Sequence, residues 1–170
     1  MIDDEELPAA DLIGRRLLKV TTAWHHYADD GPSLVHLWLH LEGLGPVLFH
    51  TPSTGLSLRA DQPHGPYSME ECGSVSVIDG SPDVPVTRFV GQTIRAVREI
   101  DYDDGHVGFT AGLTLRFPSG SIRLLGLEDS LLIAHDQHLG AIEAHLREDV
   151  DTRDGDEPRV RTTPSTGPKA

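Results

Sequence analysis

"LIGRRLLKV" (Leu12–Val20) and "FVGQTIRAV" (Phe89–Val97) follow one pattern, in which two apolar residues and a glycine open a stretch that ends in valine. The similarity continues downstream of Gly14 and Gly91, and the offset between matching residues drifts only from 77 to 75. The small gaps fall in polar, glycine-containing stretches typical of loops. We therefore interpret the chain as one unit used twice.

The matching positions are mostly apolar residues at alternate places in the chain. The pairs are Leu37 with Leu113, Leu39 with Leu115, Leu41 with Phe117, Gly45 with Gly120, Val47 with Ile122, Phe49 with Leu124, Leu56 with Leu131 and Leu58 with Ile133. Strict alternation in "VHLWLHL" and "LTLRF" predicts strands with one buried face. The glycine-containing turns "EGLGP" and "PSG" that follow predict a β-hairpin in each half.

These patterns predict a mainly β protein, either an antiparallel barrel or a two-sheet sandwich, built from two duplicated β units with a short C-terminal helix. A parallel α/β fold is disfavoured because no helical pattern separates consecutive strands. The repeat units span 12–62 and 89–137, and the connecting region 63–88 carries one further strand, Ser74–Asp79. Asp136 is placed to cap a helix at about 137–148, in which Gly140 is a weak point.

The ends of the chain differ in composition from residues 12–148, which we expect to form a single β-rich domain. Residues 1–11 hold five acidic side chains and no basic one. Residues 149–170 contain almost no side chain that can join a core. Both segments are too polar to offset the entropy of ordering, so we predict that they are disordered.

The formal net charge is −13 at pH 7, and residues 12–148 are acidic in their own right. Such a surface repels phosphate, which disfavours nucleic-acid binding and suits a basic protein partner. Cys72 is the only cysteine, so an intrachain disulfide is excluded. No stretch is apolar enough to cross a bilayer and no secretory signal is visible, so we expect a cytoplasmic protein without a membrane partner.

Two acidic pairs, Asp29-Asp30 and Asp103-Asp104, fall in corresponding loops and are candidates for an acidic rim around a basic partner. The side of the second predicted strand that faces away from the leucines carries the other candidates, since packing leaves that side free to differ between the halves. The candidate partner-binding residues are Asp29, Asp30, His36, Trp38, His40, Asp103 and Asp104.

No motif predicts a metal site, a cofactor or catalysis. His135, His138 and His145 are the nearest approach to a ligand set, but their spacing differs from that of common zinc sites. His36 and His40 would lie about 13 Å apart on one strand, too far for one ion. Cys72 stands beside two carboxylates, which disfavour the thiolate that a nucleophile needs, even with His64 as a base.

The glycine-led motif used twice, with "SMEECGSVSVIDG" between the two copies, resembles small bacterial β-rich proteins, including immunity proteins that neutralise toxins. The resemblance covers residues 12–136 and implies a non-catalytic protein-binding module, such as an immunity protein against a basic toxin. Two alternatives stay open. One is a small-ligand or metal-binding β-barrel, enzymatic or not, that uses His and Asp residues. The other is a homo-oligomeric structural protein whose edge strands pair, for example in a homodimer.

Overall fold

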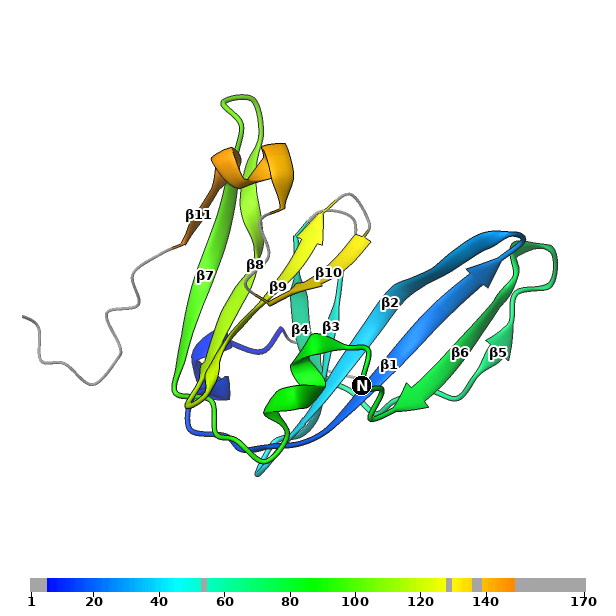
Figure 1. Cartoon of the computed structure of the whole chain (residues 1–170), viewed down its shortest axis with the longest axis horizontal. Coiled ribbons are helices and arrows are strands. Elements are labelled where there is room, and N and C mark those ends of the chain that lie inside the picture. Colours follow the sequence, from blue (N-terminus) through cyan, green and yellow to red (C-terminus); the bar gives the residue numbers. More distant parts are fainter. Residues whose placement is uncertain (1–5, 53–54, 128–129, 136–138, 149–170) are drawn as a thin grey trace, which may run out of the picture.

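The protein is mainly β, with two antiparallel sheets that lie side by side in Figure 1. The computed structural model describes residues 6–52, 55–127, 130–135 and 139–148. The first sheet has six strands in the order β4-β3-β2-β1-β6-β5, and the second has five in the order β10-β9-β8-β7-β11. The strands are β1 (Leu17–Tyr27), β2 (Asp30–Leu41), β3 (Gly45–His50), β4 (Ser57–Ala60), β5 (Tyr67–Ser68), β6 (Ser74–Asp79), β7 (Ala96–Asp103), β8 (Gly108–Phe117), β9 (Gly120–Leu127), β10 (Ser130–Ala134) and β11 (Leu146–Glu148).

The helices among the described residues are short 3-10 turns, and none of them is long or apolar enough to span a membrane. They are η1 (Ala9–Leu12), η2 (Glu70–Cys72), η3 (Pro85–Phe89) and η4 (Gly140–His145). A 3-10 turn of this length adds little stability of its own, because its hydrogen-bond geometry is poor. η1 and η3 are instead held by buried side chains, such as Leu12 and Phe89.

Each sheet contains a meander of four strands that are neighbours both in the chain and in the sheet. β1, β2, β3 and β4 form the meander of the first sheet, and β7, β8, β9 and β10 form that of the second. The alternation in β2 and β8 fixes which side chains face inward, because successive residues of a strand point to opposite faces. β6 and β5 extend the first sheet beyond β1, and β11 extends the second beyond β7.

The two sheets are joined where the segments that carry Gly14 and Gly91 run antiparallel to each other, with an isolated bridge between Arg16 and Thr93. Four backbone hydrogen bonds link the segments: Gly14 N–H to Ile94 C=O (2.8 Å), Gly91 N–H to Leu17 C=O (2.7 Å), Ile94 N–H to Arg15 C=O (2.9 Å) and Leu17 N–H to Gln92 C=O (2.9 Å). Both glycines have positive φ, +83° and +91°, a conformation that L side chains rarely adopt.

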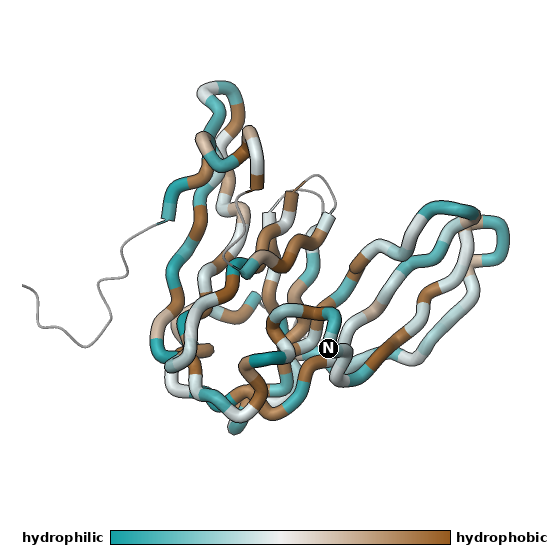
Figure 2. The backbone as a smooth tube through the Cα atoms, in the orientation of Figure 1, coloured by the Kyte–Doolittle hydropathy of each residue, from teal (hydrophilic) through white to brown (hydrophobic). Residues whose placement is uncertain are grey.

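The inner faces of the two sheets share one hydrophobic core. Leu37, Leu39 and Leu41 come from the first sheet and are at most 1% exposed. Leu113 and Leu115 come from the second sheet and belong to the same cluster. Figure 2 shows hydrophobic residues recurring along the strands of the body, while the far tip of the β1–β2 hairpin is hydrophilic. Burial of the inner faces is therefore the main favourable term in folding.

The first sheet also buries side chains on its outer face, which we define as the face turned away from the shared core. Trp38, Ala23, Leu48 and Val75 form a separate cluster there. In many two-sheet proteins the outer face of a sheet is exposed to water. Because this cluster is buried, another segment of the chain must cover it. The segment 61–66 supplies part of that covering, since His64 lies against the Trp38 ring.

The N-terminal segment packs against the body from Leu7 onward, which differs from the prediction that residues 1–11 are disordered. Leu7 N–H donates to the Leu58 carbonyl (2.8 Å), and Leu7 and Ala9 lie against the shared core. This contact occupies the open edge of β4. Residues 1–5 and the predicted tail at 149–170 lie outside the described residues.

The predicted C-terminal helix is wrong for the part of it that the structure describes. Gly140 to His145 form the 3-10 turn η4, and Leu146 to Glu148 form β11, which pairs with β7. Gly140 has φ of +74°, so the chain turns there and does not continue an α-helix. Leu146 pairs opposite Tyr102, and this tertiary pairing outweighs a weak helical pattern. Asp136, the predicted cap, lies outside the described residues.

Candidate functional site

The two acidic pairs lie at the tips of hairpins that belong to different sheets. Asp29 and Asp30 lie at the β1–β2 turn, and Asp103 and Asp104 at the β7–β8 turn. Figure 1 shows the β7–β8 tip at the top of the view and the β1–β2 tip far from it at the right. The structure therefore does not bring the four carboxylates together on one surface.

Asp104 acts as a turn-forming residue. Its Oδ1 accepts hydrogen bonds from the backbone N–H groups of His106 and Val107 (2.8 Å each), and its Oδ2 accepts one from the Tyr102 hydroxyl (3.2 Å). Hydrogen bonds from Val107 and His106 to the charged form lower the pKa of the Asp104 carboxyl. Asp103 accepts a similar bond from Gly105 N–H (2.8 Å). Side chains of this kind commonly fix a turn.

Trp38, His36 and His40 lie on the outer face of β2. Trp38 is 1% exposed, and the two histidines are half-buried. The indole is therefore part of the fold of this sheet and is not accessible as the centre of an interface in the free protein.

His40 belongs to a hydrogen-bond chain that argues against catalysis. The Thr21 hydroxyl donates to Asp79 Oδ1 (2.6 Å), so its single proton is committed, and it accepts a bond from His40 Nε2 (2.8 Å). Lys19 Nζ lies 3.6 Å from the other carboxylate oxygen of Asp79. Burial, and after it Lys19, lowers the pKa of His40, while the Thr21 bond lowers that of Asp79. Since His40 donates here, it is not a base for Thr21, and this arrangement does not activate a nucleophile.

Three histidines gather over Trp38. His36 Nδ1 and His64 Nε2 are 3.0 Å apart, and the ring centroids of His36 and His50 are separated by 6.3 Å. The His64 ring lies edge-on to Trp38, with ring centroids 5.0 Å apart. Burial, followed by His64 and His50, lowers the pKa of His36 to about 4, and burial also lowers that of His50. Both imidazoles are thus neutral at pH 7.

The strand order explains how His64 reaches this cluster. β4 and β5 are the two opposite edges of the first sheet, so the segment 61–66 that connects them crosses the whole sheet. It crosses on the outer face, because His64 contacts His36 and Trp38 there. In the sequence, His64 stood out only as a conceivable base for Cys72, and His50 did not stand out. A signal for His50 existed, since the β2–β3 hairpin pairs Leu37 with Phe49 and so brings His36 near His50.

The other histidine candidates have separate surroundings. His135 follows β10, where Arg88 Nη1 lies 3.3 Å from its Nδ1, and a neighbouring cation is unfavourable for a metal ligand. His145, in η4, lies edge-on to the Tyr102 ring, with centroids 5.6 Å apart. His138 lies outside the described residues. In the part of the chain that the structure describes, no group of three or more His, Cys, Asp or Glu side chains could hold a metal ion.

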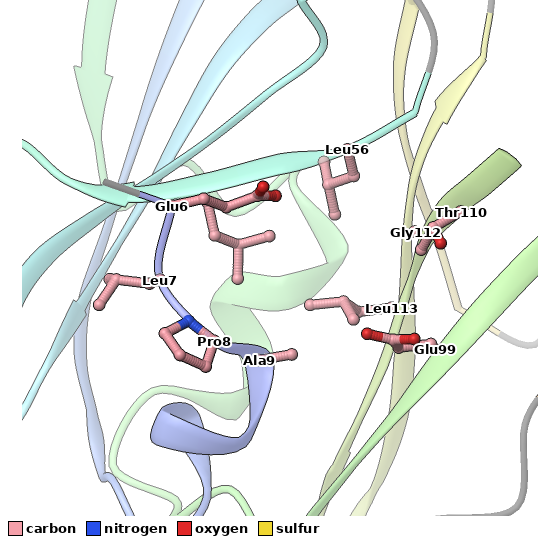
Figure 3. A pocket seen from close by; sticks show the side chains of 10 residues that line it. Glu6, Leu7, Pro8, Ala9, Leu56, Glu99, Thr110, Gly112 and Leu113 are labelled. Carbon is pink, nitrogen blue, oxygen red and sulfur yellow. The ribbon is translucent and has the colours of Figure 1, made fainter. Parts of the chain in front are cut away.

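A cleft of about 430 Å³ opens between the two sheets beside the N-terminal segment. Leu56, Leu58 and Leu113 supply much of its apolar lining. Figure 3 shows Glu6, on the N-terminal segment, and Glu99, on β7, on opposite sides of this space. Both carboxylates belong to exposed residues, so the cleft combines an apolar floor with an acidic rim.

A second cleft, of about 500 Å³, lies between β10 and the β1–β2 hairpin. Its lining is mostly apolar and includes Trp24, Leu34, Pro85 and Ile133. Asp83 is the acidic side chain among its lining residues. The cleft beside Glu6 and Glu99 is therefore the better match to the acidic character of the chain.

Comparison with known proteins adds no relative, since no family model, curated protein or solved structure matches this chain.

Proposed function

We propose that the protein is a non-catalytic module that binds a basic protein partner through the cleft between Glu6 and Glu99, which we call the acidic cleft. The observation that carries the proposal is the placement of two carboxylates across a space of about 430 Å³ that is partly lined by leucine side chains. A lysine or arginine side chain combines an apolar stem with a cationic head. The leucine lining suits the stem, and the two carboxylates suit the head.

The charge of the whole chain supports a basic partner. A net charge of −13 gives a field that attracts a cationic protein from a distance and raises the association rate. The same field disfavours nucleic acid, whose phosphates carry charge of the same sign.

The absence of an activated nucleophile among the residues described above supports binding over catalysis. Thr21 has its proton committed to Asp79, and Cys72 is an exposed thiol in η2 next to two glutamates. The narrower form of the proposal is an immunity protein in the cytoplasm, with a basic toxin as the partner. The lone cysteine and the acidic composition support that location.

We also propose that the fold arose by duplication, with units at 12–62 and 89–137. The strongest support is the junction between the sheets. The junction is symmetric under a shift of 77 residues. The Gly14 N–H to Ile94 C=O bond in one half corresponds to the Gly91 N–H to Leu17 C=O bond in the other. The bridge partners Arg16 and Thr93 are also 77 residues apart, so they occupy equivalent positions. The two matching meanders and the shared burial of Leu39 and Leu115 give further support.

The binding proposal is tested with a hexa-arginine peptide as the probe. The test variant is the double substitution Glu6→Gln, Glu99→Gln. The matched control is Asp29→Asn, Asp30→Asn, which removes the same amount of charge from a hairpin tip. We expect the test variant to bind about tenfold more weakly, or about 1.4 kcal/mol, because it removes two exposed charge pairs of about 0.7 kcal/mol each.

The control variant has lost the same charge elsewhere on the protein. It therefore separates binding at the acidic cleft from the general attraction of a cationic peptide to an acidic protein. Equal weakening in both double variants, or no binding by the natural chain at low salt, would contradict the proposal. Strong weakening in the control alone would instead favour the hairpin tips that the sequence pointed to.

A further inference from the structure

The segment 61–66 crosses the outer face of the first sheet, and the proposed function does not use it. From its geometry we propose that this segment is a cover of Trp38 that acid releases. The segment stays in place while His36 and His64 share a hydrogen bond, and it leaves the outer face when the histidine cluster takes up protons. We call the two arrangements the covered form and the open form.

The segment is tethered at its two ends and held in the middle by a histidine. Asp61 N–H donates to the Pro46 carbonyl (3.2 Å) at its start, and Tyr67 pairs with Val75 in the two-residue strand β5 just after its end. Between these ends the chain has no regular secondary structure, and its two prolines lack the N–H that a sheet hydrogen bond requires. A segment of this kind opens at a lower cost than the strands beneath it.

The hydrogen bond at the middle of the segment exists in only one protonation state of His64. His64 Nδ1 lies 2.9 Å from the Gly65 carbonyl, which can only accept, so Nδ1 carries the proton. His64 Nε2 is then the acceptor, and His36 Nδ1, 3.0 Å away, is the donor. A proton added to His64 goes to Nε2 and turns this acceptor into a second donor. Two N–H groups then face each other, and the bond is lost.

His36 favours the open form at low pH as well. Burial, followed by His64 and His50, lowers the pKa of His36 from 6.5 to about 4 in the covered form. Opening takes His64 away and admits water, so this pKa returns toward 6.5. The covered form is therefore favoured above pH 6.5 and loses that advantage as the pH falls toward 4. With a full return to 6.5, the ratio of open to covered chains rises about 20-fold between pH 7 and pH 5.

The groups around the cluster leave this pH dependence in place. Burial is the main cause of the lowered pKa of His36 and of His50, and Arg59 adds to it. Asp61 and Glu6 act in the opposite sense but more weakly. β1 presents the uncharged Ala23 opposite His36. The titratable and charged groups that face the cluster are His50 on β3, Arg59 on β4, Asp61 and His64 in the segment, Tyr67 on β5 and Glu6 in the N-terminal segment.

Two buried polar atoms at the cluster lack a hydrogen-bond partner among the described residues. They are Trp38 Nε1 and His50 Nδ1. A buried donor or acceptor without a partner destabilises the form that buries it. Opening admits water to such atoms, which offsets part of the loss when the His64 ring leaves Trp38. The covered form is thus close enough to opening for a change of protonation to shift the balance.

The test is an NMR measurement of solvent accessibility on the full chain, with a neutral gadolinium chelate as the paramagnetic probe at pH 7 and at pH 5. The indole N–H peaks of Trp38 and Trp24 are read separately. We expect Trp38, which is 1% exposed, to be protected at pH 7 and its paramagnetic relaxation to rise by up to about 20-fold at pH 5. The backbone amides of Leu39 and Leu115, in the shared core, should stay protected at both pH values.

The test variant is the double substitution His36→Gln, His64→Gln. Glutamine has both a donor and an acceptor, so it can keep the bond, but it does not titrate. We expect Trp38 to stay protected at pH 5 in this variant, and His64→Gln alone to show a smaller rise than the natural chain. The matched control, His106→Gln, His145→Gln, removes two histidines beside the second sheet and should open as the natural chain does.

The proposal is overturned if Trp38 stays protected at pH 5 in the natural chain, or if the rise is unchanged in the double variant and in His64→Gln. It is also overturned if Leu39 and Leu115 become accessible together with Trp38, because that result means unfolding of the whole domain. Loss of the rise in the control variant would place the trigger beside the second sheet and overturn it too. None of these results bears on the acidic cleft.

Discussion

Replacing Gly14 or Gly91 by alanine tests whether the two halves are equivalent where they meet. Both glycines have positive φ, and a Cβ built on either one meets no atom within 4 Å. The cost of the substitution therefore comes from the backbone conformation alone. A left-handed conformation costs an L residue about 1–2 kcal/mol, and the lower entropy of alanine in the unfolded chain returns about 0.4–1 kcal/mol.

We expect each alanine variant to lose about 1 kcal/mol of unfolding free energy, and the double variant about 2 kcal/mol. The two sites lie about three residues apart along the junction ladder, or about 10 Å, which is far enough for additive effects. Urea unfolding followed by the fluorescence of the buried Trp38 measures this. With a slope of about 2 kcal/mol per molar urea, each midpoint falls by about 0.5 M.

Gly112→Ala is the contrasting control, because its Cβ would overlap the Leu124 carbonyl oxygen of the neighbouring strand. We expect this variant to lose far more stability than either junction variant, or not to fold. A difference of more than about 1 kcal/mol between Gly14→Ala and Gly91→Ala would contradict the equivalence of the two glycines, since equivalent conformations without contacts give equal costs.

Three further expectations follow from individual side chains. The pKa of His36 is lowered from 6.5 to about 4, so the folded state resists protonation of this ring. The stability that the neutral ring contributes is complete above pH 6.5 and is lost as the pH falls toward 4. Urea midpoints should therefore fall less steeply with decreasing pH in His36→Gln than in the natural chain. Asp104→Ala should speed hydrogen exchange at the amides of His106 and Val107, seen by NMR, because it removes the acceptor of both; unchanged protection would count against its role in the turn. Glu143→Ala should lower the free energy of unfolding, measured by urea unfolding, by about 1 kcal/mol. The reason is that Glu143 accepts hydrogen bonds from the Arg123 guanidinium and from the Leu139 backbone N–H beside η4. An unchanged free energy of unfolding would show that the Arg123–Glu143 pair is not stabilising.

The parts of the fold that sequence could predict are those set by local alternation. Leu37 and Leu39 alternate with polar and aromatic residues, and this period of two is the geometry of a half-buried strand. The hairpin turns follow from glycine-containing turns between two such strands. The end of the chain was mispredicted because β11 depends on a distant partner, Tyr102 in β7, whereas the helical pattern was local and interrupted by Gly140.

The candidate sites depend on which strands become sheet edges, and one sequence does not show this. His64 lies over Trp38 only because β4 and β5 are opposite edges of the sheet. Glu6 faces Glu99 only because the N-terminal segment lies along β4. The polar composition of that N-terminal segment predicts that it does not pack. The acidic loops were visible in the sequence, but their separation follows from the placement of their hairpins in two sheets.

Binding of a basic partner at the acidic cleft is tested directly by a two-dimensional NMR titration of the full chain with hexa-arginine, read at the backbone amides. We predict that the largest shifts occur around the acidic cleft, at Leu7, Leu58 and Thr110. Shifts concentrated at the two hairpin tips, Asp29-Asp30 and Asp103-Asp104, with the cleft amides unmoved, would contradict it.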